Sequence, residues 1–526
     1  MGGLRRLHLG PTLVVSVLIF PEMAIAQNAV RFPWEPSAKV TVPEHKELAE
    51  GKLSAAELAR RGELLFSARF TVDDGLGRPG STGDSKPTIR IDKKYPTLLR
   101  TAGPDANSCA GCHNQPRVGG SGDFVTNVFV GAQFSDPPTM SVSVDATNER
   151  NTNSMFGAGL VELVAREITA DLLKLKDDVI ERAQRSNAPV SVRLMSKGID
   201  YGELTALPDG SLNYDKVEGI DLDLVVKPFG SKGVAVSLRE FTNFALNHHH
   251  GIQPTERFGW TRTGIRDFDS DGVEDEFNTG QVTALTLFQA ALKPPTRRRA
   301  IADPIDKSLQ HRGEVVFSEI GCSQCHRPTL PLKTNLFSEP NPYNRWGSLQ
   351  RSDGQGVVEI EIDIGSTNLV KKLSDGTFEV SIFTDFKRHR ICDRDTPHFC
   401  NEKRRQDFVP QDQFLTTKLW DAGSSAPYGH RGDLSTITEA ILNHGAEARR
   451  QRDRFVALAV EDKRAMIAYL RSLQVCPVTD CKDVEQKGAA NESGNGQVYR
   501  VELNATDPIG NNGRESASMG LTRSPR

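Results

Sequence analysis

Two copies of the pattern Cys-x-x-Cys-His are the strongest chemical feature of this sequence. They occupy residues 109–113 and 322–326. In such a pattern two thiols bond the vinyl groups of a haem, and the adjacent histidine ligates the iron. A zinc site would need four ligands closing on one ion, and a thioredoxin-like pair does not require histidine after both motifs. The sequence therefore predicts two covalently bound c-type haems. Their attachment residues would be Cys109, Cys112, His113, Cys322, Cys325 and His326.

A seven-residue repeat precedes each motif. Residues 61–67 read Arg-Gly-Glu-Leu-Leu-Phe-Ser, and residues 312–318 read Arg-Gly-Glu-Val-Val-Phe-Ser. The apolar residues after each glycine have helical spacing, so each copy is predicted to form the N-terminal helix of a haem domain. We therefore expect a mainly α fold with two cytochrome c-like haem domains that arose by duplication.

Composition and periodicity set the expected domain boundaries. The first haem domain is predicted over residues 42–300 and the second over residues 305–478. Strand-like alternation at about 188–230 indicates a small β insertion in the first domain. Residues 483–526 have almost no core-forming side chains, which predicts a disordered tail. Further helices are expected at residues 53–66, 156–174 and 279–292.

The N-terminus has the pattern of a secretory signal peptide over residues 1–26. Arginines at positions 5 and 6 precede an apolar run at 9–20, and small residues follow at 24–26. The run is shorter than the roughly 20 residues that span a membrane, so we expect a periplasmic or secreted protein without a membrane span. The charges nearly balance, with 65 Lys and Arg against 68 Asp and Glu, so no nucleic-acid role is expected.

Four of the eight cysteines lie outside the two haem motifs. Cys392 and Cys400 are eight residues apart, and Cys476 and Cys481 are five apart. In an oxidising compartment, two local disulfides would account for all four, although spacing alone leaves the pairing open.

A segment after the second motif resembles a known family. Residues 426–432 read Ala-Pro-Tyr-Gly-His-Arg-Gly. This is similar to the Pro-Tyr-Phe-His-x-Gly segment of bacterial di-haem cytochrome c peroxidases, in which the distal ligand of the second haem follows that histidine by fourteen residues. His444 follows His430 by fourteen residues. The family ligand is Met or, in the enzyme that matures methylamine dehydrogenase, Tyr.

The resemblance implies that His444 ligates a bis-His second haem, with a lower potential than a His/Met haem. His430 would then lie beside that haem without binding its iron. The alternative for His444 is a histidine at a helix C-terminus that interacts with the dipole, with Gly445 as the cap. A structural turn is the alternative for His430.

The sequence identifies the residues that would face the first haem less clearly. Residues 150–162 resemble the Arg-x-x-Pro segment of the same superfamily, although the proline is absent. A peroxidatic site needs an open sixth position and a group that moves a proton, so Glu162 and Arg150 are the candidate catalytic residues. The alternative is an amphipathic helix with solvated charges. One of the histidines at 248–250 could also reach a haem, although surface or core-capping roles are commoner.

An acidic segment between the motifs has the composition of a calcium loop. Carboxylates alternate around a turn-forming glycine, as when oxygens converge on a hard cation. The twelfth-position Glu of an EF-hand is missing, and an acidic solvated turn is the alternative. The candidate Ca²⁺ ligands are Asp267, Asp269, Asp271 and Asp275.

The resemblance covers about residues 58–473 and points to the peroxidase-like di-haem oxidoreductase branch of the di-haem cytochrome c peroxidase superfamily. It implies an enzyme whose first haem meets hydrogen peroxide. The second haem would relay electrons from a small cytochrome or a cupredoxin. Two alternatives stay open: a non-catalytic periplasmic electron carrier, and a di-haem oxygenase or oxidase acting on an organic substrate.

Overall fold

The computed structural model describes residues 37–77, 105–128, 147–297, 304–364 and 367–475, with a few isolated positions and short strands outside these ranges. The predicted signal peptide, Cys476 and Cys481 lie outside the described residues, as does most of the predicted tail. None of the described helices is long and apolar enough to cross a membrane.

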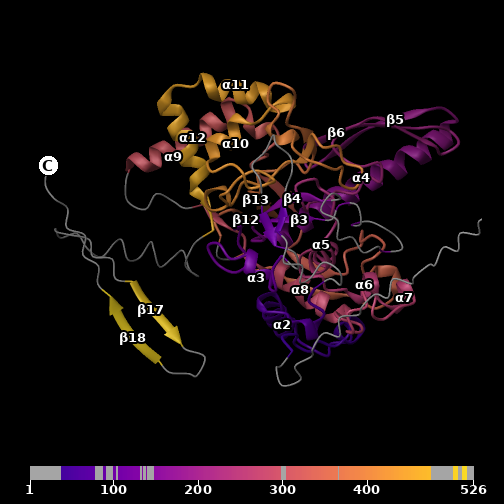
Figure 1. The fold of residues 1–526 in the computed structure, drawn as a ribbon. Helices are drawn as coiled ribbons and strands as arrows, with labels where there is room; N and C mark the ends of the chain where they lie inside the picture. Colours follow the sequence, from indigo (N-terminus) through magenta and orange to yellow (C-terminus); the bar gives the residue numbers. More distant parts are fainter. Residues whose placement is uncertain are drawn as a thin grey trace, which may run out of the picture.

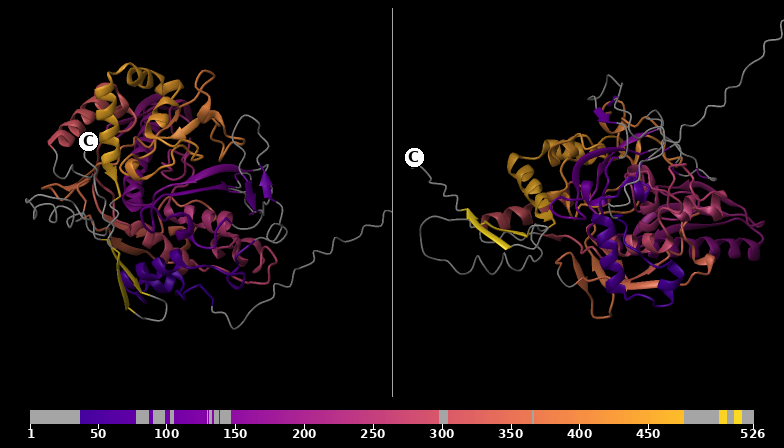
Figure 2. Two further views of the ribbon diagram at one scale, coloured as in Figure 1. Left: turned by 60° about the vertical axis from the view of Figure 1, so that its left-hand side comes forward. Right: turned by 60° about the horizontal axis from the view of Figure 1, so that its bottom comes forward.

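Two pairs of packed helices form the framework around the haem motifs. Helix α2 (Ala55–Ser67) packs on α8 (Thr279–Ala291), and α9 (Pro304–Glu319) packs on α12 (Val460–Ser472). Figure 1 and the left view of Figure 2 show the two pairs at opposite ends of the molecule. The remaining helices are α1 (His45–Ala49), α3 (Cys109–Cys112), α4 (Ala158–Ser186), α5 (Leu238–Ala245), α6 (Thr255–Phe258), α7 (Trp260–Thr263), α10 (Ile437–Leu442) and α11 (Arg449–Ala457).

The glycine of each repeat permits a close helix crossing. A Cβ at Gly62 would lie 2.0 Å from the carbonyl oxygen of Ala284 on α8. A Cβ at Gly313 would likewise lie 2.0 Å from the carbonyl oxygen of Ala465 on α12. Backbone approach of this kind requires a residue without a side chain. The repeat therefore marks the same packing device in both halves.

The phenylalanine of each repeat packs near the histidine of its haem motif. The ring of Phe66 lies 6.1 Å from that of His113, and the ring of Phe317 lies 6.5 Å from that of His326. Because glycine and phenylalanine are four residues apart, one helix turn links the crossing to the motif histidine. The helix pairs thus fix where both motifs lie.

The prediction of a mainly α fold of cytochrome c-like domains is wrong. The described residues are 37% helical and 18% strand, with many small sheets. Each sheet has two or three strands. Long connections contain apolar alternations of only three or four residues, such as the buried-exposed pattern at Val358–Glu361, which is too short for a stable helix but sufficient for a paired strand.

The strands pair antiparallel. The two-stranded sheets are β1 (Pro87–Ile89) with β2 (Leu99–Thr101), β3 (Gly122–Val128) with β4 (Asn148–Thr152), β8 (Thr296–Arg297) with β16 (Leu473–Gln474), β10 (Leu336–Glu339) with β11 (Val358–Glu361), β14 (Arg388–Arg390) with β15 (Gln413–Leu415), and β17 (Val501–Thr506) with β18 (Asn512–Ala517). One three-stranded sheet has the order β12 (Val370–Lys372), β13 (Phe378–Val380), β9 (Leu330–Leu332).

The other three-stranded sheet forms where the β insertion was expected. It has the order β5 (Val190–Ser196), β6 (Ile199–Ala206), β7 (Leu212–Val217). Helix α4 packs against β5 and ends at Asn187, which adopts a left-handed conformation. In Figure 1 the C-terminal part of α4 extends to the right together with β5 and β6.

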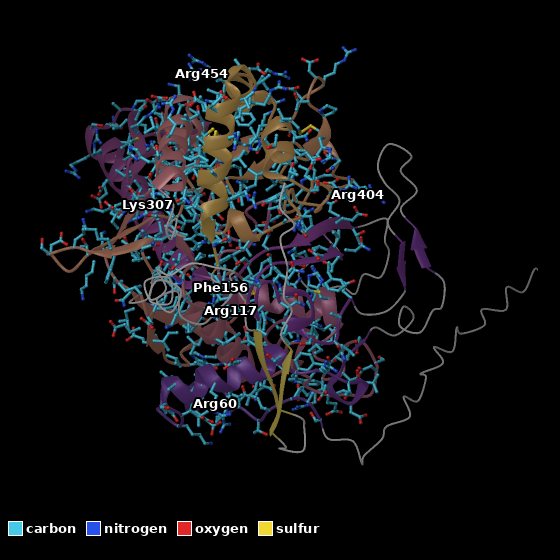
Figure 3. The ribbon with its side chains drawn as sticks, turned by 90° about the vertical axis from the view of Figure 1, so that its left-hand side faces the viewer. Arg60, Arg117, Phe156, Lys307, Arg404 and Arg454 are labelled. Carbon is cyan, nitrogen blue, oxygen red and sulfur yellow. A yellow bond between two sulfur atoms is a disulfide. The ribbon has the colours of Figure 1, made fainter. Side chains whose placement is uncertain are left out.

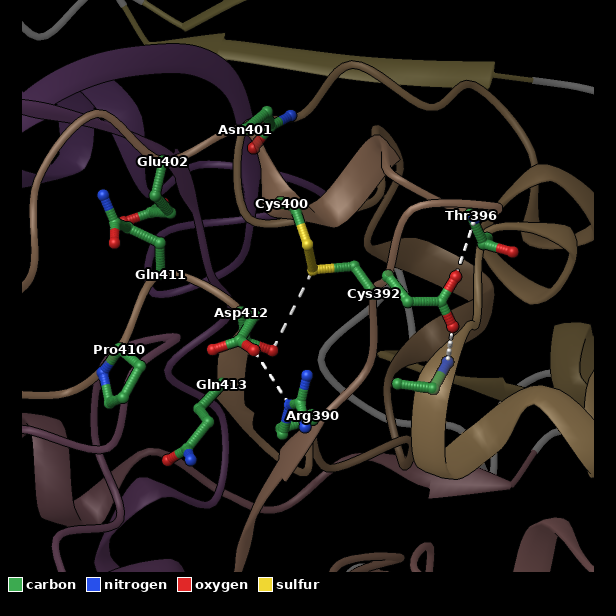
Figure 4. Close-up of a disulfide and its surroundings, with 12 residues drawn as sticks. Arg390, Cys392, Thr396, Cys400, Asn401, Glu402, Pro410, Gln411, Asp412 and Gln413 are labelled. Atoms are coloured by element: carbon green, nitrogen blue, oxygen red, sulfur yellow. Dashed lines mark hydrogen bonds and ion pairs between the residues drawn. A yellow bond between two sulfur atoms is a disulfide. The ribbon is translucent and has the colours of Figure 1, made fainter.

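The predicted disulfide between Cys392 and Cys400 is confirmed. It lies in a small core with Phe399, Phe414 and Leu434, apart from the main core that spans both helix pairs. Figure 4 shows the bridge beside Asp412, whose carbonyl oxygen lies 4.0 Å from the Cys392 sulfur.

The helix crossing predicts a sensitive glycine. In Gly313→Ala the new methyl group would force α9 and α12 apart, at a cost of about 1–3 kcal/mol. Thermal unfolding of the holoprotein should show a lowered melting temperature. The control is Ser308→Ala, at an exposed position of the same helix. Equal melting temperatures for the two variants would contradict the proposed packing role.

Candidate functional site

A single cavity in the described part of the chain is lined by both Cys-x-x-Cys-His motifs. All six predicted haem-attachment residues face it. The walls of the cavity come from segments far apart in sequence, because each helix pair positions one of the two motifs and both motifs face the cavity. The other histidines in its lining are His248, His249, His250, His389, His430 and His444.

The first motif forms a single helical turn, α3, which brings its two thiols onto one side. The His113 amide donates to the Cys109 carbonyl at 3.0 Å, and His113 Nδ1 lies 3.2 Å from the Gly120 carbonyl. Burial lowers the pKa of His113 to about 4, the Gly120 bond opposes this, and nearby His249 lowers it further. The imidazole is therefore neutral at pH 7, as a metal ligand must be.

The loop after the first motif is fastened to the start of α4. The Arg117 guanidinium lies 4.5 Å from the centroid of the Phe156 ring, and Figure 3 labels both residues. The Gly119 amide donates to the His113 carbonyl at 3.0 Å. These contacts hold the ligand histidine against the long helix.

The second motif repeats the geometry of the first. The His326 amide donates to the Cys322 carbonyl at 3.0 Å. His326 Nδ1 lies 3.0 Å from the Thr417 carbonyl and 3.2 Å from the Phe383 carbonyl. Burial, and then the proximity of His444, lower the pKa of His326 to about 4. In both motifs a carbonyl at Nδ1 leaves Nε2 as the nitrogen that can bind a metal.

His444 lies in the cavity near His326, just after α10. Helix α10 begins with a capping box in which Thr436 and Glu439 each bond the other's backbone amide. His444 Nδ1 lies 2.7 Å from the Ala440 carbonyl, which fixes the ring and directs Nε2 elsewhere. A helix C-terminal histidine would make the same bond, but its place in a cavity shared with His326 favours the ligand role.

His430 is buried beside this group. Its Nε2 lies 2.6 Å from Asn401 Oδ1 and 3.2 Å from Glu402 Oε1. Its ring lies 4.5 Å from that of Phe414, and the ring of Phe399 lies 5.9 Å from that of His444. His430 thus lies in the wall of the cavity that His444 also lines.

Arg150 also lines the cavity, but its charge is already paired. Its two terminal nitrogens donate to the Glu402 carboxylate at 2.6 and 2.9 Å, and one of them donates to Gln406 Oε1 at 2.6 Å. A bidentate pair of this kind holds its geometry strongly. Arg150 therefore positions β4 and Glu402.

Glu162, a predicted catalytic residue, lies outside the residues that line the cavity. Its side chain is fully buried. The carboxylate accepts from Arg166 at 2.5 Å, the Asn341 side chain at 2.6 Å and the Leu238 amide at 2.7 Å. The alternative of a solvated helix face is wrong here, because α4 buries this turn against α5 and β10.

Glu162 belongs to a buried ion network centred on Arg239. The Arg239 guanidinium is fully buried and donates to Glu256 at 2.5 Å and to Glu339 at 3.1 Å. Arg166 lies 3.5 Å from Glu339 and so joins the two parts. Removing one partner of such a network leaves an uncompensated buried charge, at a cost of about 3–5 kcal/mol.

The three consecutive histidines occupy a π-helical turn, Leu246–His250, at the end of α5. His248 stacks on Phe244, and His250 Nε2 lies 3.6 Å from the Cys109 sulfur. His249 Nδ1 lies 2.8 Å from the Asp105 carboxylate, which is itself buried. The three neighbouring histidines thus have three separate contacts, and the Asp105 carboxylate orients His249.

His389 is a charged residue of the site that sequence reasoning missed. It lies between Asp385 and Glu447, at 2.8 Å from each. Burial alone would lower its pKa, but hydrogen bonds to Asp385, Cys325 and Glu447 raise it to about 12. Asp385 precedes His389 by four residues, whereas Glu447 is 58 residues away in sequence, so no local motif predicts the complete group.

The acidic loop places three of its four predicted ligands together. Asp267, Asp269 and Asp271 each offer an oxygen within 4.8 Å of the others. Asp275 instead forms an ion pair with Arg266. The fourth predicted ligand, Asp275, therefore pairs with Arg266 and does not join the other three carboxylates.

The residues present fit two haems. Cys392 and Cys400 are oxidised, whereas the four motif cysteines form no disulfide, although each pair is close enough in sequence to meet. Each motif also presents a neutral histidine whose Nδ1 is held by carbonyl oxygen. This combination of unpaired thiols and an oriented imidazole is the donor set of a c-type haem.

No protein-family model matches this chain, and no curated protein sequence does. Among solved structures, hydrazine synthase of Kuenenia stuttgartiensis aligns over 90% of this chain and 100% of its own, with 13% identity and a TM-score of 0.34. The diheme peroxidase BthA of Burkholderia thailandensis aligns over 47% and 66%, with 15% identity and a TM-score of 0.26. A MauG-like protein associated with microbial copper homeostasis aligns over 52% and 79%, with 12% identity and a TM-score of 0.24. Likenesses this weak carry no argument about this chain.

The two motifs predict independent haem attachment. Replacing both cysteines of one motif by alanine should remove one haem and leave the other, because each motif supplies its own thiols. Intact mass and the pyridine haemochrome spectrum count the haems. The Cys392→Ala, Cys400→Ala variant is the control and should retain two haems. The assignment would be contradicted if the motif variants kept both haems while the control variant lost one.

Proposed function

We propose that this protein is a periplasmic di-haem c-type cytochrome oxidoreductase that reduces hydrogen peroxide at the first haem. The observation that carries the proposal is the single cavity lined by both haem motifs, with a carboxylate-oriented histidine on the side of the first. Cys109, Cys112 and His113 would hold the first haem. When bound, the haems would supply the iron centres that accept and pass on electrons.

His249 and Asp105 would handle protons at the first site. Reduction of peroxide to two waters consumes two protons and two electrons, so a group must deliver protons to the departing oxygen. Asp105 accepts a hydrogen bond from His249 Nδ1–H, and its buried carboxylate would stabilise the protonated ring. Proton exchange then takes place at Nε2. This pair takes the role that sequence reasoning assigned to Glu162.

Residues of the second half would receive the electrons. His326 and His444 would bind the second haem from its two faces, as the resemblance implies. The Phe399 ring packs near His444, and the Phe414 ring packs near His430, at this end of the cavity. A small cytochrome or a cupredoxin from the periplasm would be the electron donor.

The proton role predicts a strong effect of one histidine. His249→Ala should lower peroxide turnover by about 10²–10⁴-fold. Because Asp105 acts on protons only through the His249 ring, Asp105→Asn should lower peroxide turnover less than His249→Ala does. Turnover is measured with purified holoprotein and a reduced small cytochrome as donor, and the pH profile is recorded for each variant.

His311→Ala, at an exposed position of α9, is the matched control and should keep wild-type turnover. An unchanged rate in His249→Ala would sink the proton role. If wild-type protein neither turns over peroxide nor binds carbon monoxide when reduced, the electron-carrier alternative replaces the peroxidase proposal.

The ligand role of His444 predicts a change of potential. Thioether ligation favours ferrous iron more than imidazole does, so His444→Met should raise the reduction potential of the second haem. A spectroscopic redox titration measures both haems separately. If the potential of neither haem changes, His444 is not an iron ligand, and the helix C-terminal alternative holds.

A further inference from the structure

The acidic loop between α7 and α8 contains more than a cluster of surface carboxylates. Asp267, Asp269 and Asp271 have oxygens within 4.8 Å of one another. Two of the loop's carboxylates are almost completely buried: Asp269 is 3% exposed and Glu276 is 2% exposed. Acidic residues of a solvated turn would remain accessible to water.

Two buried oxygens of this loop have no hydrogen-bond partner among the described residues. They are Asp269 Oδ1 and Glu276 Oε1. Their sister oxygens are occupied: the Gln253 amide donates to Glu276 Oε2 at 2.6 Å, and the Gln253 side chain donates to Asp269 Oδ2 at 3.3 Å. Gln253 therefore brings the two carboxylates together. A buried acceptor without a partner is expensive, and much more so when it is charged.

Lys39 reaches this loop, and its hydrogen bond there goes to the backbone. The Lys39 ammonium donates to the backbone carbonyl of Glu276 at 2.7 Å. Without a further cation, the carboxylates destabilise one another.

We propose that this loop binds one Ca²⁺ through Asp267, Asp269, Asp271 and Glu276. Ca²⁺ takes six to eight oxygen ligands in flexible geometry, which suits several carboxylates on an irregular loop. Mg²⁺ demands a near-ideal octahedron and retains water, so it suits the site less well. The Asp267 oxygens accept from the amides of Asp271 and Gly272, and each keeps a second lone pair for the ion.

The ligand set differs from the one that sequence spacing predicts. Asp275 has a backbone φ of 46° and pairs with Arg266, so its side chain is committed elsewhere. The next residue, Glu276, is 2% exposed and shares Gln253 with Asp269 as a hydrogen-bond donor. Sequence spacing predicts Asp275 as the fourth ligand, whereas the folded structure favours its neighbour Glu276.

The site also bears on the histidine turn. Gln253, which bonds two of the proposed ligands, accepts from the Asn247 side chain at 3.1 Å within the turn that contains His249. A cation would therefore fix Gln253 and, through it, the position of this turn. This consequence rests on the proposed function, whereas the binding of Ca²⁺ does not.

The test uses the purified holoprotein after treatment with a calcium chelator. Isothermal titration with CaCl₂ should show one site per chain, and Ca²⁺ should raise the melting temperature more than an equal concentration of MgCl₂ does. Glu276→Gln should weaken Ca²⁺ binding at least tenfold, because a neutral amide oxygen binds a hard cation more weakly than a carboxylate oxygen does.

Asp275→Asn is the matched control from the same loop, and it should bind Ca²⁺ like wild type. The proposal is overturned if chelated wild-type protein binds no Ca²⁺, if Asp275→Asn loses binding as Glu276→Gln does, or if Glu276→Gln retains full affinity. Because these readouts do not involve peroxide, a failure of the calcium site is distinguishable from a failure of the proposed activity.

Discussion

The buried guanidinium of Arg239 is the interaction on which the rest of the structure depends. Its partners are Glu256 on α6 and Glu339 on β10, and Arg166 of α4 joins the same network. A charge removed from water is tolerated only when every donor and acceptor around it is satisfied. These segments can therefore assemble in essentially one arrangement. Arg239 is also in the first turn of α5, the helix that leads to the histidine turn of the cavity.

The two halves share a framework but differ in what they place opposite the motif histidine. Both use a helix with a glycine crossing and a phenylalanine that packs near the motif. In the first half, a π-helical turn presents His249, whose ring is held by Asp105. In the second half, a short capped helix presents His444, whose ring is held by a backbone carbonyl. A carboxylate stabilises a protonated ring far better than a carbonyl does, so the halves are suited to different chemistry.

Local sequence patterns predicted the features that depend on short spacing. The two motifs, the helices α2, α8 and α9 and the Cys392–Cys400 bridge each involve residues within one or two turns, or a short loop. The paired strands of the connections were missed because three alternating residues do not distinguish a strand from a loop. The pairing of His249 with Asp105 joins positions 144 residues apart, which no periodicity reveals. The burial of Glu162 was missed for the same reason, because it depends on α5 and Asn341.

The shared cavity has a consequence for how the protein matures. The motif thiols line its interior, so the folded chain would offer them poorly to an enzyme that attaches haem. In an oxidising compartment the same four thiols compete with Cys392 and Cys400 for disulfide partners, since thiolate exchange does not distinguish correct from incorrect pairs. With two c-type haems, as we propose, attachment would come early, on an open chain. Each thioether bond would then remove a cysteine from this competition permanently and leave four cysteines, Cys392 and Cys400 among them, to pair with one another.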